Sequence, residues 1–140
     1  MALRASTLQK GQSFEAVIVD GLTRTQIVQY AGASGDYNPL HSDEVFATQV
    51  AGYPTIFAHG MLTMGMTGHM LTDLVGDGRL LRFGGRFTSQ VWPGDTLTTR
   101  ATVEDVHDDD DGPVVELTVS TTNQNGAEVF GGYAAARVDP

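Results

Sequence analysis

The sequence predicts an α+β fold in which a curved antiparallel sheet of five strands wraps around one long central helix. Two observations carry this prediction. The segment Ala58–Gly76 has apolar residues around most of its helical circumference, which is typical of a helix enclosed by other structure. From Leu80 onward apolar residues recur with a period of two, and turn signals divide this half of the chain into four consecutive strands.

The length and composition suit an ordinary globular protein. The chain has 140 residues, of which 41% are hydrophobic and 18% charged, and we expect one domain over residues 1–140. It contains no cysteine, so neither a disulfide nor a thiol nucleophile is available. No segment approaches the ~18 uninterrupted apolar residues of a membrane span, and Met1–Gly11 lacks the apolar stretch of a signal peptide. We therefore expect a cytoplasmic protein that does not bind a membrane.

The chain is acidic, with 17 acidic against 8 basic residues and a formal net charge of −9. This field opposes nucleic acid, which needs a basic face, but leaves room for a small anionic ligand held by local arginines. Six of the acids lie in Glu104–Asp111, which we interpret as a solvated hairpin loop. The alternative, a loose calcium site, lacks the ligand spacing and the closing glutamate of an EF-hand loop.

The first elements are predicted from local signals. Phe14–Asp20 is rich in β-branched residues and reads as a strand. Thr23 and Gln26 have the spacing of a capping box and open a short helix, which the following glycines end. Ser42 is expected to cap a second helix that stops near Gly52.

The central helix contains Gly65 and Gly68, each costing helix propensity of ~1 kcal/mol. We therefore expect other structure to approach the helix closely at both positions. In the strand that follows, Leu80–Val91, the alternation places Leu81 and Phe83 on one face and the arginines on the other. The remaining strands are expected at Thr96–Val106, Pro113–Thr122 and Glu128–Val138, with turns at Pro93-Gly94 and Asn125-Gly126.

An acid and an imidazole lie in the break between the first two helices. Asp36 and His41 are separated by Asn38-Pro39, which stops a helix and stiffens the connection. Irregular segments of this kind often carry functional groups. The helix start at Ala58–Gly60 could offer free N–H groups to an anionic oxygen. The competing interpretation is that Asp36 stabilises a turn and His41 is an ordinary histidine at a helix start.

These residues resemble a known signature. The segment Gly35–His41 reads GDYNPLH and, with Tyr30 and Asp43 beside it, resembles the (R)-specific enoyl-thioester hydratases, the hydratase-2 or MaoC-like members of the hot-dog fold. AHGML at 58–62 resembles the start of that family's central helix, and RFTSQVWPGDTL at 86–97 resembles its strand-turn-strand segment. YAGASGDYNPLH and AHGMLTMGM are most similar to the catalytic subunit of heterodimeric (3R)-hydroxyacyl-ACP dehydratases.

The resemblance implies a function and an assembly. The activity would be reversible hydration of trans-2-enoyl thioesters of CoA or ACP to (3R)-3-hydroxyacyl thioesters, without a cofactor. Asp36 and His41 would hold and activate a water, and the Gly60 N–H would bind the thioester oxygen. Alternatively, Gly60 serves only close packing. The resemblance also implies a dimer with an identical or a related hot-dog chain.

Other residues receive supporting roles. Asn38 is expected to brace the loop, or else only to favour its turn, and Tyr37 to line the acyl site. His59 is expected to be a packed histidine that supports the site. Arg82 and Arg86 are candidates for the phosphates of the thioester carrier, or else ordinary surface cations. No metal is expected, because the sequence lacks H-E-x-x-H and Cys/His clusters.

Three rival functions remain open. A hot-dog thioesterase usually relies on a carboxylate on the central helix, where this chain offers only Asp73. A non-catalytic subunit supporting an active partner is disfavoured by the presence of both Asp36 and His41. A serine hydrolase is disfavoured because Gly32–Asp36 misses the G-x-S-x-G elbow by one position.

Overall fold

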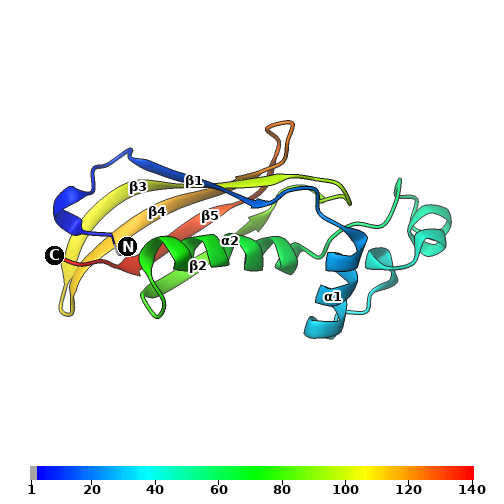
Figure 1. Ribbon diagram of the computed structural model, residues 1–140, viewed down its shortest axis with the longest axis horizontal. Helices are drawn as coiled ribbons and strands as arrows, with labels where there is room; N and C mark the ends of the chain where they lie inside the picture. The colour runs from blue at the N-terminus through cyan, green and yellow to red at the C-terminus, as the bar shows by residue number, and fades with distance from the viewer. Residues whose placement is uncertain (1–2) are drawn as a thin grey trace.

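The computed structural model describes residues 3–140 as one five-stranded antiparallel sheet in the order β1-β3-β4-β5-β2, with a long helix packed on it. Figure 1 shows α2 running along one face of the sheet, while α1 and the segment after it lie beyond one end of α2. This confirms the predicted α+β architecture. The strands are β1 (Ser13–Val19), β2 (Leu80–Phe87), β3 (Leu97–Asp109), β4 (Gly112–Thr122) and β5 (Glu128–Arg137), and the helices are α1 (Arg24–Ser34), α2 (Gly60–Val75), two 3₁₀ turns (Ala5–Thr7, Pro39–His41) and a π-helical turn (Phe46–Val50).

The capping signals of the two early helices have different outcomes. The box at α1 is confirmed: the Gln26 N–H donates to Thr23 Oγ1 at 3.0 Å and the Thr23 N–H donates to Gln26 Oε1 at 2.9 Å. The predicted cap at Ser42 is wrong, because the Ser42 N–H closes the preceding turn on Pro39. Asp43 caps instead, its Oδ1 accepting from the Phe46 N–H at 3.1 Å. The helix that follows contains a π-helical turn and ends before Gly52, which has a φ of 77°.

The predicted limits of β2 also need correction. The strand ends at Phe87 and not at Val91, because the Thr88 and Ser89 hydroxyls both donate to the Glu128 carbonyl and draw the chain out of the ladder. A register shift between Leu80 and Arg82 turns Leu81 outward, leaving its side chain 49% exposed. The predicted alternation of inward and outward side chains is therefore lost at Leu81, at the start of the strand.

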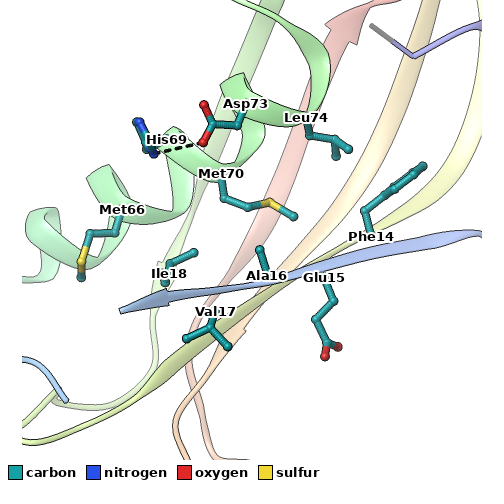
Figure 2. Close-up of a pocket in the computed structure, with 10 residues that line it drawn as sticks. All are labelled: Phe14, Glu15, Ala16, Val17, Ile18, Met66, His69, Met70, Asp73 and Leu74. Atoms are coloured by element: carbon teal, nitrogen blue, oxygen red, sulfur yellow. Dashed lines mark ion pairs between the residues drawn. The ribbon is translucent and has the colours of Figure 1, made fainter. Parts of the chain in front are cut away.

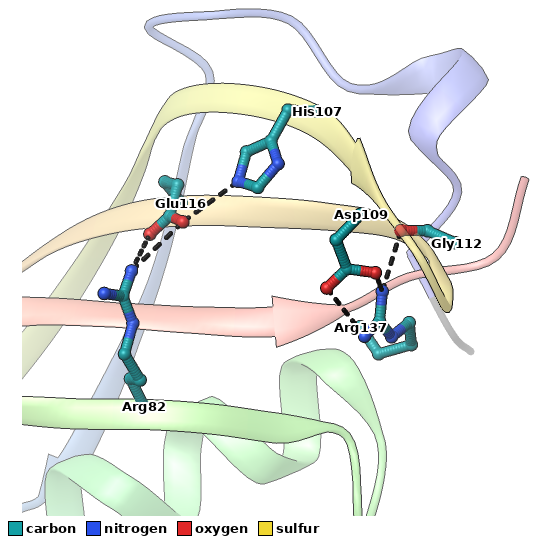
Figure 3. Close-up of polar contacts among 6 residues, drawn as sticks. All are labelled: Arg82, His107, Asp109, Gly112, Glu116 and Arg137. Carbon is teal, nitrogen blue, oxygen red and sulfur yellow. Dashed lines mark hydrogen bonds and ion pairs between the residues drawn. The ribbon is translucent and has the colours of Figure 1, made fainter.

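The acidic run is mostly strand, contrary to the expected hairpin loop. β3 continues to Asp109, so that only the tip beyond it turns. Figure 3 shows the contacts that support this extension: Arg137 of β5 donates to both carboxylate oxygens of Asp109 and to the Gly112 carbonyl. On the same hairpin His107 Nε2 lies 3.1 Å from the Glu116 carboxylate. Ion pairs between strands thus stabilise an extended strand where the acidic composition alone predicts a loop.

The core lies between α2 and the sheet, and it contains a cluster of buried hydroxyls. Met70, Leu71 and Val75 of α2 pack against apolar side chains of β3, β4 and β5. Among them Thr67, Thr99 and Thr121 form a threonine triad whose side chains are 1% exposed or less. The Oγ1–Oγ1 distances are 2.8 Å for Thr67–Thr121, 2.7 Å for Thr99–Thr121 and 3.5 Å for Thr67–Thr99. The three hydroxyls therefore satisfy one another, as buried polar groups must.

The sheet covers only one side of α2, so the helix is less enclosed than its composition predicts. Met61, on the uncovered side, is 55% exposed. The expected close approach occurs at Gly68, where a Cβ would lie 3.1 Å from Cε1 of Phe83, but not at Gly65, which has no neighbour within 4 Å. Among residues 3–140 no helix is both long and apolar enough to cross a membrane.

This difference between the two glycines gives a stability prediction. Gly65→Ala should raise the free energy of unfolding by ~1 kcal/mol, because alanine restricts the unfolded chain and fills open space. Gly68→Ala should gain less or lose stability, because its methyl group meets the Phe83 ring. Urea unfolding of both variants measures the contrast. A destabilising Gly65→Ala would mean that another chain packs against this side of α2.

Candidate active site

The site begins where α1 ends. Gly35 has a φ of 74° and donates its N–H to Ala31, so the chain leaves the helix through a left-handed residue. Asp36 follows, and its Oδ1 accepts from the Asn38 N–H at 3.2 Å. The Asn38 side chain in turn caps the 3₁₀ turn, its Oδ1 accepting from the Leu40 N–H at 3.0 Å. Asn38 thus has the contacts that a bracing role requires.

His41 lies at the end of this turn and is buried, with 8% of its surface exposed. Its Nδ1 lies 2.6 Å from the Phe57 carbonyl oxygen. Because a carbonyl can only accept, Nδ1 carries the proton and Nε2 keeps a lone pair. Burial lowers the pKa of His41 below its usual value of 6.5, and the charge of His59 lowers it further, while the Phe57 carbonyl and Asp36 oppose the shift. His41 is therefore a neutral base near pH 7.

His59 contacts both predicted catalytic residues. Its Nε2 lies 3.0 Å from the backbone carbonyl of Asp36. Its ring stacks on the His41 ring with centroids 3.8 Å apart and planes at 27°, and Tyr30 packs edge-on behind it at 4.8 Å. His59 is 2% exposed. Its direct contact with both partners could not be foreseen from its place 23 residues after Asp36.

The side-chain atoms of Asp36, His41 and His59 gather at one point, one atom from each lying within 4.8 Å of the others. Groups up to ~5.5 Å apart can share one bridging water, since each hydrogen bond spans ~2.8 Å. His59 Nε2 faces a carbonyl and must carry a proton, so this nitrogen offers no lone pair to a metal ion. We therefore interpret the cluster as a water site, and the expectation of no metal remains a prediction.

Gly60 opens α2 directly after His59, and within residues 3–140 its N–H has no hydrogen-bond acceptor. It borders a cavity of about 320 Å³ whose other walls come from Phe57, Thr63 and residues 87–91. A Cβ on Gly60 would lie 3.0 Å from the Phe87 ring. Both interpretations of Gly60, a free donor and a close-packing residue, therefore find support. The cavity adjoins the histidines through Phe57, whose ring meets His41 edge-on at 5.3 Å.

Three predicted site residues are not brought to this cluster. Tyr37 follows Asp36 in the chain, but its side chain is 70% exposed and lines neither the cavity beside Gly60 nor the one between β1 and α2. Arg82 donates to the Glu116 carboxylate at 2.9 Å on the sheet face shown in Figure 3. Arg86 shares that face, because Phe83 and Phe87, which each follow one of the two arginines, meet α2 on the other face. Within one chain the two arginines therefore point away from the site, and their proposed carrier contacts have no support.

Two participants were missed by sequence reasoning. Phe57 acts through its backbone carbonyl, which leaves no trace in residue type. Thr63 is 1% exposed, and its hydroxyl has no hydrogen-bond partner within the described chain. Thr63 could have been noticed in the sequence, because it is a polar residue within a helix that is otherwise largely apolar.

A second hollow, of about 620 Å³, lies between β1 and α2 (Figure 2). It includes Asp73, the only carboxylate on the helix, which pairs with His69 at 3.4 Å. Asp73 lies 13 residues after Gly60, or ~20 Å along the helix axis. A thioesterase site built on Asp73 would therefore lack the amide donors of the helix start.

An antiparallel sheet packed on a central helix, with an acid and an imidazole at the helix start, is the arrangement expected of a hot-dog protein. The MaoC like domain family matches residues 6–125, and the chain belongs to this family. The resemblance seen in GDYNPLH is thereby confirmed.

Relatives and solved structures agree with this assignment. The chain is 43% identical over 84 residues to 3-hydroxyacyl-thioester dehydratase Y of Mycobacterium tuberculosis, covering 58% of this chain and 29% of the relative. It is 43% identical over 74 residues to the peroxisomal enoyl-CoA hydratase 2 of Arabidopsis thaliana, covering 51% and 24%. It thus spans less than a third of these curated relatives.

The structure of R-hydratase PhaJ1 from Pseudomonas aeruginosa matches with a TM-score of 0.84 at 26% identity, covering 99% of this chain and 86% of that one. The (R)-hydratase of A. caviae matches with a TM-score of 0.81 at 28% identity, covering 94% and 98%.

Proposed function

We propose that the protein catalyses the reversible hydration of trans-2-enoyl thioesters to (3R)-3-hydroxyacyl thioesters. The observation that carries this proposal is the convergence of Asp36 and the His41 lone pair beside the free N–H of Gly60. Hydratases and dehydratases of thioesters among the named relatives support the same chemistry.

The proposed mechanism uses one water held between Asp36 and His41. As the water oxygen bonds to C3 of the enoyl group, the pair takes up its proton and electron density moves to the thioester oxygen. The Gly60 N–H, with the helix dipole behind it, stabilises this oxygen. The pair then delivers a proton to C2 on the same face, which restores its starting state. Asp36 and His41 act as one coupled acid/base unit.

The substrate, the assembly and the compartment are further parts of the proposal. CoA or an acyl carrier protein would carry the acyl group, since the printed names of relatives include enoyl-CoA hydratase and hydroxyacyl-thioester dehydratase. A second hot-dog chain, identical or related, would pair with this one. A cytoplasmic location fits the absence of cysteine.

The test is an assay of the purified protein on trans-2-enoyl-CoAs of graded chain length, alone and with candidate partner chains. We expect loss of the conjugated enoyl absorbance, a (3R)-3-hydroxyacyl product and no free thiol. Release of thiol from acyl-CoA would instead identify a thioesterase. No change in absorbance with any partner or chain length would contradict the proposed function.

The lowered pKa of His41 gives a prediction for the pH dependence of kcat/KM. In the folded protein the pKa of His41 lies below 6.5, so most of the imidazole is still neutral when the pH reaches 6.5. The value of kcat/KM should therefore decline only below pH 6.5. Folding stability follows the same direction. The neutral imidazole is favoured in the fold, so its contribution is complete above pH 6.5 and is lost as pH falls through and below the folded pKa. A pH–rate profile from pH 4.5 to 8 measures this, and an acid limb centred above 6.5 would contradict it.

A further inference from the structure

His59 joins two segments that otherwise reach the site independently. Asp36 follows α1, whereas His41 ends the 3₁₀ turn. His59, at the start of α2, touches both: the Asp36 carbonyl at 3.0 Å and the His41 ring at 3.8 Å between centroids. It is 2% exposed, so its ring offers almost no surface to a substrate.

We propose that His59 is a positioning residue that fixes the acid and the base relative to each other, its Nε2–H holding the Asp36 backbone while its ring supports that of His41. This inference rests on the proposed function. It assigns to His59 a role in the rate of the chemical step and none in substrate binding.

The hydrogen bonds of His59 define its tautomer. Since the Asp36 carbonyl can only accept, His59 Nε2 carries the proton and Nδ1 is left with a lone pair. Within the described residues Nδ1 is buried without a partner, and so is the hydroxyl of Thr63. Side chains four residues apart on a helix are neighbours, so this donor and this acceptor lie on the same side of α2. The two groups make no hydrogen bond to each other, so the tautomer of His59 is set by the Asp36 carbonyl.

The geometry also makes His41 sensitive to what occupies position 59. The titratable groups that face His41 are Asp36 from the loop and His59 from α2, and Tyr30 of α1 lies behind His59. Two stacked imidazoles repel each other when both are protonated, and this repulsion contributes to lowering the pKa of His41. Removing the second imidazole should therefore raise the pKa of His41, an effect that a purely structural role for His59 would not produce.

Two variants separate the two contacts. His59→Phe keeps a ring against His41 but removes the donor to Asp36, and His59→Gln keeps an N–H donor but removes the ring. We expect each to lower kcat about 10- to 100-fold, because small misplacements of reacting groups cost this much, and to change KM by less than about threefold. In His59→Phe the acid limb of the pH–rate profile should also move to higher pH. His69→Phe, the same substitution at an exposed histidine on α2, is the matched control and should retain wild-type kcat.

The same variants can be tested without turnover. Titration of the His41 imidazole by NMR in wild type and in His59→Phe should show a higher midpoint in the variant. This measurement stands even where the wild type hydrates no enoyl-CoA, so the failure of the proposed function is distinguishable from the failure of the inference. The inference is overturned by folded His59 variants with wild-type kcat, by losses confined to KM, or by an unchanged His41 midpoint in His59→Phe.

Discussion

Asp36→Asn and His41→Asn are each expected to lower kcat/KM for a trans-2-enoyl-CoA by about 10²–10⁴-fold, the usual contribution of positioned acid/base groups. Asparagine at 36 keeps the oxygen that accepts from the Asn38 N–H, and asparagine at 41 keeps an N–H near the Phe57 carbonyl. Both substitutions therefore remove proton transfer with little change in the loop. The double variant should be about as inactive as either single one, because residues that act as a unit are not additive.

The matched control for these variants is Asp43→Asn. Asp43 is a carboxylate of the same loop that caps the Phe46 N–H, and asparagine can cap equally well. Activity of Asp43→Asn should equal that of wild type. Circular dichroism and thermal melting establish that each variant is folded. Wild-type rates in folded Asp36→Asn and His41→Asn would remove the pair from the mechanism.

Gly132→Ala is expected to reduce the free energy of unfolding by ~3 kcal/mol or more, the upper range for overpacking a well-packed interior. Gly132 pairs with Gly85 across β5 and β2. A Cβ at this position would overlap the Gly84 carbonyl oxygen and lie 2.6 Å from the Gly85 Cα. These are backbone atoms, so relief requires moving β2 away from β5 and losing part of their ladder. Urea unfolding and the yield of folded protein measure the effect.

Gly32→Ala provides the comparison. Gly32 lies in α1 with nothing within 4 Å of an added Cβ, so alanine should stabilise the protein by up to ~1 kcal/mol. The two substitutions have identical chemistry and opposite expected signs. A Gly132→Ala variant as stable as wild type would mean that the two strands do not approach as closely as described.

Features set by neighbours in the chain were predictable. The capping box of Thr23 and Gln26 and the hairpin at Asn125-Gly126, where Gly126 has a φ of 76°, both depend on residues within one turn. Features set by distant pairing were not. The extension of β3 to Asp109 depends on Arg137, which lies 28 residues later, and the outward turn of Leu81 depends on a register shift against β5. The acids are exposed, as their composition predicted, but composition carries no information about a partner strand and so predicted a loop where β3 continues.

The same distinction applies to the site. Asp36 and His41 are joined by a short, stiffened segment, so their proximity was predictable from spacing. The part played by His59 depends on how the start of α2 folds back onto the loop, and its two contacts use a backbone carbonyl and a ring face. For Arg82 and Arg86 the alternation already placed both on the face opposite Phe83, which the structure retains, so their distance from the Asp36–His41 pair within one chain was predictable.

The threonine triad has a consequence for where α2 can sit. Apolar side chains tolerate sliding, but three mutually bonded hydroxyls accept only one axial offset of the helix against β3 and β4. Displacement by one turn, ~5.4 Å, would present Leu71 or Thr63 to Thr99 and Thr121 in place of Thr67. Either displacement would part the buried Thr67 hydroxyl from Thr99 and Thr121, which keep their bond to each other, at a cost of ~1–3 kcal/mol. The triad thus fixes the axial position of α2 on the sheet. The position of the Gly60 amide, two turns upstream on the same helix, therefore depends on a contact in the core.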